Sequence, residues 1–260
     1  MGRILSAEVR KFKRSAILWV IVAVVLFPVA VSLLMAMGME ANGRRVPFFI
    51  FFSNHFLFVH LLIGAPLFTL IAGYVFSREH QERTINHLLT YPYSRWQWYA
   101  GKLLIVAPIV ALVLAVQFLL QWGAGALYTG EFLPKDAFMD VPASEMLMRI
   151  IKAALLGILF QILLIPAGAA AGILGKNVIA PVVLGVCAAG INGVILIAGI
   201  SMKYAALNPW FIPILHSGMM AETPSDDVFL RAYVSLAAVC IVSLAVGLHR
   251  FVKADVHSGS

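Results

Sequence analysis

Long apolar stretches alternate with short polar segments along nearly the whole chain. A helix rises about 1.5 Å per residue, so roughly 17–25 mostly apolar residues are needed to cross a hydrocarbon core about 30 Å thick. Six stretches meet this requirement, and the pattern predicts an all-α, polytopic membrane protein that forms one domain over residues 1–260. The predicted spans are residues 15–37, 56–76, 103–128, 150–174, 178–200 and 232–249.

One apolar stretch, residues 47–76, is too long for a single upright span. Three polar residues, Ser53, Asn54 and His55, lie inside it. We therefore expect the chain to break at these residues, at the membrane surface, before the second span begins.

The composition indicates that lipid is the solvent of this chain. Hydrophobic residues make up 62% of the 260 residues and charged residues 12%, whereas a soluble domain is about 45–50% apolar and about 25% charged. A soluble chain of this size has too little interior to bury so much apolar surface, and a disordered chain would be poor in apolar residues. Cys187 and Cys240 lie in apolar runs, which indicates no disulfide framework.

Lys and Arg gather on one side of the predicted topology. The N-terminal arm, the segments after the second and fourth spans and the C-terminal tail hold 12 of the 19 basic residues and 4 of the 12 acidic residues. Because cytoplasmic loops are enriched in Lys and Arg, this distribution predicts that both termini are cytoplasmic. The net charge of +7 then follows from topology, and we expect no nucleic-acid partner.

The N-terminal arm, residues 1–14, mixes basic residues with Ile4, Leu5, Val9 and Phe12. This mixture is typical of an amphipathic helix that lies on the inner leaflet, with membrane lipid as its partner. A disordered basic tether would have the same composition, and both interpretations stay open.

A few polar residues lie within the predicted spans. An intramembrane titratable group such as His60 is a functional candidate by default, although a neutral histidine bonded to a neighbouring helix is the interpretation we favour. The amides of the third, fourth and fifth spans would line a polar translocation path or form hydrogen bonds between helices. These amides belong to Gln117, Gln121, Gln161 and Asn192.

Small residues in the fourth span, Gly168 and Gly172 with alanines between them, predict a smooth face for close helix packing. The same run is the nearest imitation of a phosphate-binding loop, but its spacing is wrong and Asn177 replaces the hydroxyl residue. The sequence also has no His-Glu-x-x-His motif and no cysteine pair at metal-ligand spacing. We therefore predict no ATPase activity of its own, no catalytic residues and no metal site.

The segment between the second and third spans, residues 77–102, departs from the rest of the chain. It predicts a short amphipathic helix held between two spans, which could transmit force from a cytoplasmic partner or serve as a plain interfacial connector. Its parts are a charged start (Glu79, Glu82, Arg83), an apolar stripe (Ile85, Leu88, Leu89), a helix stop (Pro92) and a cap for the third span (Ser94).

This segment resembles the signature of permease subunits of type-2 ATP-binding-cassette exporters. In that family a Glu-rich start leads through Glu-x-Gly-Thr and Leu-Leu-Thr to Pro-x-Ser-Arg, and then to Gly-Lys at the next span. Arg83 stands where the family usually has Gly, so the local turn geometry is not carried over. The matching residues are Glu79, Glu82, Thr84, Leu88, Leu89, Thr90, Pro92, Ser94, Arg95, Gly101 and Lys102.

The layout resembles the same family, with a basic arm, six spans and an apolar segment between the fifth and sixth spans. That segment lies in the predicted outer loop, residues 201–231, and contains Pro209, Trp210 and Pro213. It is apolar but shorter than a span, which predicts a re-entrant or interfacial helix pair on the outer face.

The resemblance implies a membrane subunit that is driven by separate ATPases. Two ATPase subunits would hold ATP and Mg²⁺ and dock on the segment 77–102, a second permease chain would complete a homodimer or heterodimer, and this chain would bind no cofactor. The chain is most similar to permeases of bacitracin and lantibiotic self-protection, which expel antimicrobial peptides across the bacterial plasma membrane. The implied coupling residues are Glu79, Glu82, Arg83, Thr84, Leu88, Leu89, Pro92, Tyr93 and Arg95.

Two other functions are compatible with the residues. An intramembrane enzyme acting on a lipid-linked substrate would need facing His, Glu or Ser residues at membrane depth, and the spans offer only His60 and the amides. A membrane scaffold or sensor subunit would leave the segment 77–102 without a moving partner.

Overall fold

The computed structural model describes residue 15 and residues 17–44, 46–81, 94–131, 142–217 and 224–253, without the side chains of residues 79 and 80. All regular structure in these ranges is helical, and six helices are long and apolar enough to cross a membrane. The prediction of an all-helical protein with six spans is therefore confirmed. The N-terminal arm lies outside the described residues.

The spans are single helices, except for the second, which combines three elements. They are α2 (Ile17–Ala41), α3 (Phe49–Asn54) with η1 (His55–Ile63) and α4 (Gly64–Gln81), α6 (Arg95–Thr129), α7 (Ala143–Gly175), α8 (Ile179–Ile197) and α11 (Asp226–Lys253). Three short helices lie between α8 and α11: α9 (Met202–Ala205), η2 (Pro209–Phe211) and α10 (Ile212–His216). We call residues 202–216 the short-helix segment.

The predicted break at Ser53, Asn54 and His55 is wrong, because the second span runs unbroken through these residues. Their polar atoms find partners inside the bundle instead: Ser53 Oγ donates to the carbonyl of Phe49 at 3.2 Å, and His55 bonds to Gln117 of α6. From His55 to Ile63 the helix is a π-helix, η1, with backbone bonds of the i→i+5 type, and it continues as the α-helix α4. The span is therefore longer at its start than the predicted 56–76.

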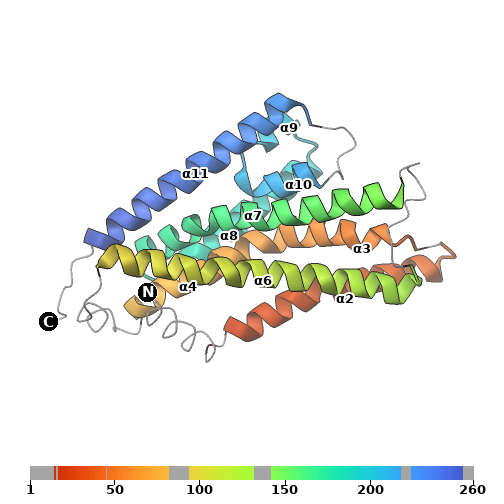
Figure 1. The fold of residues 1–260 in the computed structure, drawn as a ribbon, viewed down its shortest axis with the longest axis horizontal. Helices are drawn as coiled ribbons and strands as arrows, with labels where there is room; N and C mark the ends of the chain where they lie inside the picture. Colours follow the sequence, from red (N-terminus) through yellow and green to blue (C-terminus); the bar gives the residue numbers. More distant parts are fainter. Residues whose placement is uncertain are drawn as a thin grey trace.

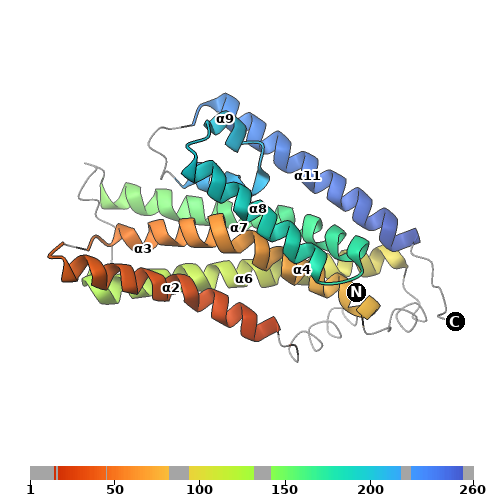
Figure 2. The ribbon, with the colours of Figure 1, turned by 180° about the vertical axis from the view of Figure 1, so that it is seen from behind.

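The helices form a bundle with two distinct ends (Figure 1). At one end α4 stops at Gln81 and α6 begins at Arg95, and α7 and α11 also end there; we call this the loop end. At the opposite end α2 meets α3, and α6 is followed by α7. Figure 2 shows the same arrangement from behind, with α2 and α8 in front. The short-helix segment lies alongside α7, between it and α11, and not beyond the end of the bundle (Figure 1).

Backbone contacts hold α4 against α7 and α8 near the loop end. A Cβ atom built on Gly172 would lie 2.8 Å from Cα of Gly73, and one on Gly168 would lie 2.7 Å from Cα of Thr69, so neither position has room for a side chain. Such small residues allow the close helix approach that stabilises membrane bundles. We call Gly73, Gly168, Gly172 and Gly185, which meet between these three helices, the glycine seam.

The tight turn from α7 to α8 explains how the seam is kept in register. Lys176 ends α7 in a left-handed conformation with φ of 52°. Asn177 Oδ1 then accepts hydrogen bonds from the backbone N–H groups of Ile179 and Ala180, both at 3.0 Å, and so satisfies donors of the first turn of α8. The two helices thus enter the seam from a short, well-bonded connection.

Burial differs strongly between the spans. In its most apolar window the second span is 67% buried inside the chain, whereas α2 is 28% and α11 only 17% buried. Large apolar side chains cover the outside, including Trp19 with 78% and Leu127 with 90% of its surface exposed. Soluble monomers rarely expose so many large apolar side chains together, so the outer faces fit contact with lipid or with another membrane chain.

Candidate functional site

The loop-end residues predicted to couple the chain to a partner lie mostly outside the described residues. Of the implied set, Glu82, Arg83, Thr84, Leu88, Leu89, Pro92 and Tyr93 fall in the range 82–93, and Glu79 lies in α4 without a described side chain. The two helices that flank this range are described. Ser94 is the N-cap of α6, as predicted, and its backbone N–H donates to Gln97 Oε1 at 2.9 Å in a capping box.

Two basic side chains of α6 bind backbone carbonyls of neighbouring helices at the loop end. Arg95 Nη1 donates to the carbonyl of Val252 at 2.5 Å, in the last turn of α11, where carbonyls lack intrahelical partners and favour cations. Lys102 Nζ donates to the carbonyl of Val75 in α4 at 2.6 Å and lies 5.8 Å from the ring centroid of Phe76. The start of α6 is therefore joined to both α4 and α11.

The helices reach further into the segment 77–102 than the sequence predicts. α4 continues to Gln81 and α6 begins at Arg95, so Lys102 lies two turns inside α6 and is fully buried. Its charge favours a loop position, because a lone ammonium inside an apolar helix is costly. The carbonyl of Val75 and the face of Phe76 supply the contacts that make the helical position stable.

A polar layer crosses the middle of the bundle around η1. It consists of His55, His60, Gln117 and Gln161, each with at most 2% of its surface exposed. A ring nitrogen of His55, Nδ1, bonds to Oε1 of Gln117 across the gap between η1 and α6. The His55 and His60 rings lie edge to face with their centroids 5.5 Å apart. The His60 ring also stacks on the Phe56 ring, with 5.6 Å between the centroids.

The second half of the polar layer faces α7. A Cβ atom on Gly157 would lie 2.6 Å from Cε1 of the His60 ring, so the glycine makes room for the imidazole. One turn further along both helices, Gly64 makes room for Gln161, whose Nε2 would lie 3.2 Å from a Cβ at position 64. Among the described residues, His60 Nδ1 and both polar side-chain atoms of Gln161 have no hydrogen-bond partner.

Gln121 and Asn192 lie outside the polar layer and join other helices. Gln121 Nε2 donates to Ser32 Oγ at 2.8 Å and to the carbonyl of Pro28 at 3.3 Å, which links α6 to α2. Asn192 of α8 donates to the carbonyl of Leu61 in η1 at 3.2 Å. These two amides and Gln117 thus form bonds between helices, one of the two roles that the sequence leaves open.

The short-helix segment folds into the bundle and does not project from it. Pro209, Trp210 and Pro213 are all buried, and Trp210 and its neighbours pack on η1 and α7 in the same apolar cluster. Asn208 begins η2, with its Oδ1 accepting from the backbone N–H of Trp210 at 3.3 Å.

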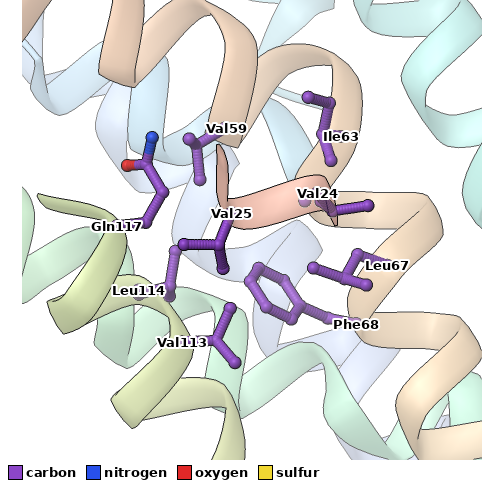
Figure 3. Close-up of a pocket in the computed structure, with 10 residues that line it drawn as sticks. Val24, Val25, Val59, Ile63, Leu67, Phe68, Val113, Leu114 and Gln117 are labelled. Atoms are coloured by element: carbon purple, nitrogen blue, oxygen red, sulfur yellow. The ribbon is translucent and has the colours of Figure 1, made fainter. Parts of the chain in front are cut away.

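A small cavity lies between α2, the second span and α6 (Figure 3). Its volume is about 10 Å³, about what one water molecule needs. Val25, Phe68 and Leu114 line it together with the Gln117 side chain, as Figure 3 shows. This cavity is too small for a peptide and is not a substrate site.

Sequence reasoning misses three residues that the structure brings into these contacts: His55, Lys102 and Asn208. The apolar pattern places His55 in a break and Lys102 in a loop, and it does not single out Asn208. Five positions separate His55 from His60, the spacing of the i→i+5 bonds of a π-helix, and this spacing is the signal that could pair them. No group of three metal-ligating side chains occurs in the part of the chain that the structure describes.

The comparisons with known proteins agree with this arrangement. Residues 4–192 match the family model described as ABC-2 family transporter protein. The chain belongs to the ABC-2 transporter family. It is also 27% identical over 208 residues to the bacitracin transport permease protein BCRB of Bacillus licheniformis, an alignment that covers 79% of this chain and 92% of that protein.

Membership of this family establishes the general role of the protein. The chain is the membrane subunit of an ABC transporter and a multi-pass protein of the bacterial plasma membrane. It is a transport component, and the family implies that it works with an ATPase subunit. The resemblance stated from the loop motif is thereby confirmed.

Proposed function

We propose that the chain pairs with a second permease chain to form the translocation path of an exporter, which two separate ATPase subunits drive from the loop end. In this arrangement the loop end faces the cytoplasm, in keeping with the concentration of Lys and Arg there. ATP and Mg²⁺ bind to the ATPase subunits, and this chain binds no cofactor.

The observation that carries the proposal is the placement of α4. This helix belongs to the most buried of the spans, it is held by the glycine seam, and it leads directly into residues 82–93. Lys102 ties it to α6, the helix on the other side of that range. A partner that pushes on residues 82–93 therefore acts on the core of the bundle, because both flanking helices are anchored there.

The close packing inside the chain and the exposed faces of its outer helices support the need for a second permease chain. The polar layer is closed within the chain, and the cavity beside it holds about one water molecule. The faces of α2 and α11 are largely exposed. A path wide enough for a peptide then lies between two chains, and the substrate we propose is an antimicrobial peptide or another hydrophobic molecule, by analogy with the bacitracin transport permease.

Co-purification tests the assembly. The chain is expressed with an ATP-binding-cassette ATPase from its own gene neighbourhood, solubilised in mild detergent and weighed by native mass spectrometry. We expect a complex of two membrane chains and two ATPases. A chain that purifies only as a monomer, with no ATPase bound in nanodiscs or detergent, would contradict the proposal.

Peptide susceptibility tests the substrate. Cells that express the chain with its ATPase are expected to tolerate at least fourfold more bacitracin than cells carrying an ATPase whose Walker Lys is replaced. A tolerance that does not depend on the ATPase would contradict export, while a functional complex without protection would leave the subunit assignment intact and reject the peptide class.

A further inference from the structure

Two side-chain amides fasten the short-helix segment to the second span. Asn192 Nδ2 donates to the carbonyl of Leu61 in η1 at 3.2 Å and to the carbonyl of Trp210 at 3.4 Å. Asn208 Nδ2 donates to Asn192 Oδ1 at 2.7 Å. We call Asn192 and Asn208 the amide link.

Asn192 is fully buried and uses its hydrogen-bonding groups without remainder. An asparagine side chain offers two N–H donors and one carbonyl oxygen. The donors serve Leu61 and Trp210, and the oxygen accepts from Asn208. One side chain of α8 therefore holds the second span on one side and the short-helix segment on the other.

Asn192 Nδ2 reaches the carbonyl of Leu61 near the end of η1, close to a proline. In η1 the backbone bonds run from residue i to residue i+5, as between the carbonyl of Val59 and the N–H of Gly64. Five residues after Leu61 stands Pro66, which has no N–H. An i→i+5 bond from position 66 to the carbonyl of Leu61 therefore cannot form, and Asn192 Nδ2 donates to this carbonyl.

The same helix carries the bond to Asn192 and leads to the loop end. Leu61 lies in η1, which continues without a break into α4 and ends at Gln81, beside residues 82–93. A change from i→i+5 to i→i+4 bonding shifts the helix by one residue, about 100° of rotation. A movement of α4 therefore reaches the carbonyl of Leu61, and any group bound to that carbonyl follows it.

We propose that Asn192 is a positioning residue that couples the short-helix segment to the second span, so that ATP-driven movement of α4 displaces this segment. The inference rests on the proposed function, because the driving force comes from the ATPase at the loop end. Asn192 holds no substrate in this scheme; it acts through Leu61 and Trp210. Without it the ATPase turns over but the segment no longer follows.

Site-specific fluorescence in the reconstituted complex tests the coupling. Both native cysteines are replaced, Cys187→Ala and Cys240→Ala, and bimane is attached in separate samples at Trp96→Cys, near the loop end, or at Lys203→Cys in α9. Both side chains are exposed on the surface of this chain. Emission is compared between the nucleotide-free complex and the complex trapped with ATP and vanadate, alongside ATP hydrolysis and export.

The test variant is Asn192→Leu, which keeps the size of the side chain and removes its hydrogen bonds. The matched control is Asn54→Leu, the same change at a buried asparagine that lies in the second span, where Nδ2 donates to the sulfur of Met35 at 3.7 Å. Asn208→Ala breaks the outer half of the amide link at a position that is only partly buried, and it decides the question if Asn192→Leu does not fold.

In the parent complex we expect both labels to respond to ATP. In Asn192→Leu the Trp96 label should respond as before, the Lys203 response should fall at least threefold, export should fall about tenfold, and ATP hydrolysis should stay within twofold. Asn54→Leu should retain both responses. A general loss of stability would weaken the responses of both labels, so a loss of the Lys203 response alone points to the amide link.

Three results would overturn the inference: a normal Lys203 response in Asn192→Leu, an equal loss of that response in Asn54→Leu, or a Lys203 label that stays silent in the parent while the Trp96 label responds. A parent complex in which neither label responds and ATP hydrolysis drives no export would instead reject the proposed function, and the inference with it.

Discussion

The glycine seam and the polar layer hold helices of the same bundle together by opposite means. In the seam, α4 touches α7 through backbone atoms, and on the α8 side the ring of Pro181 and the hydroxyl of Thr69 also enter the contact. In the polar layer, the second span meets α6 and α7 through imidazole and amide groups that fill the space between the backbones. Both regions lie on the second span, about two turns apart.

Because of this difference, the second span can be rigid near the loop end and adjustable further along. Where two helices touch through backbone atoms, the contact changes only if a whole helix moves. Side chains, in contrast, can change rotamer and exchange hydrogen bonds. The seam therefore suits transmission of a push as a rigid body. The polar layer contains a π-helix and polar atoms that have no hydrogen-bond partner among the described residues, so it suits a region that rearranges.

The largest effect is expected from a methyl group in the seam. In Gly172→Ala the new Cβ would lie 2.8 Å from both Cα and the carbonyl oxygen of Gly73, so α4 and α7 must separate. Overpacking of this kind costs about 1–3 kcal/mol, and contact with backbone places it at the upper end. The free energy of unfolding, measured by denaturant titration in detergent micelles, is expected to fall accordingly.

Gly123→Ala is the control for that change. Gly123 lies in α6, and no atom of the described residues lies within 4 Å of the position that its Cβ would take. Alanine also favours a helix over glycine by roughly 0.5–1 kcal/mol. The control should be neutral or more stable. Equal stabilities for the two variants would contradict the account of the seam.

The bond between His55 and Gln117 should show coupling in a double-mutant cycle. His55→Phe or Gln117→Leu alone leaves a buried polar group without a partner, which costs about 1–3 kcal/mol. The double variant should lose less than the sum, by roughly 0.6–1.7 kcal/mol as for other hydrogen bonds within membranes. Strict additivity would show that the two side chains do not stabilise each other.

The methyl test can be repeated in the polar layer. In Gly157→Ala the new Cβ would lie 2.6 Å from Cε1 of His60, but the neighbour is a side chain that can move. The loss of stability should be about 1 kcal/mol, smaller than for Gly172→Ala. His60→Ala in the same chain should restore it, and no comparable second-site rescue should exist for Gly172→Ala. A failure of His60→Ala to rescue would place the strain elsewhere.

The smallest effect is expected from His216, outside the spans. Burial, and then the charge of Lys152, lower the pKa of His216 from its ordinary value of 6.5. The unfolded chain therefore binds a proton more readily, so stability is fully present above pH 6.5 and falls as the pH drops below it. The melting temperature should decline toward pH 5, and His216→Phe should flatten this decline. An unchanged slope would exclude His216 as its source.

The spans could be predicted from the sequence because their signal is local. An apolar run of sufficient length predicts a helix in lipid whatever its neighbours are. Ser94 predicts the start of α6 because serine is a preferred N-cap residue. The partners of buried polar groups are not local. His55 is stabilised in a helix by a residue 62 positions away, and Lys102 by a carbonyl 27 positions away.

The same reason explains what the sequence could not decide about the intramembrane amides. Gln117 and Asn192 both reach η1 and Gln121 reaches α2, and only the fold brings these helices together. The short-helix segment is visible in the sequence as an apolar stretch shorter than a span. Its attachment to η1 runs through Asn192, which donates to the carbonyls of Leu61 and Trp210, and the apolar pattern does not contain these contacts.

The central claim, that an ATPase drives this subunit through residues 82–93, is tested most directly by charge reversal in proteoliposomes. Export per ATP hydrolysed is measured for the parent complex, for Glu82→Lys and for Glu145→Lys, an exposed control at the start of α7, at the opposite end of the bundle. We predict that Glu82→Lys lowers this ratio at least tenfold while Glu145→Lys leaves it unchanged. A normal ratio in Glu82→Lys would contradict the claim.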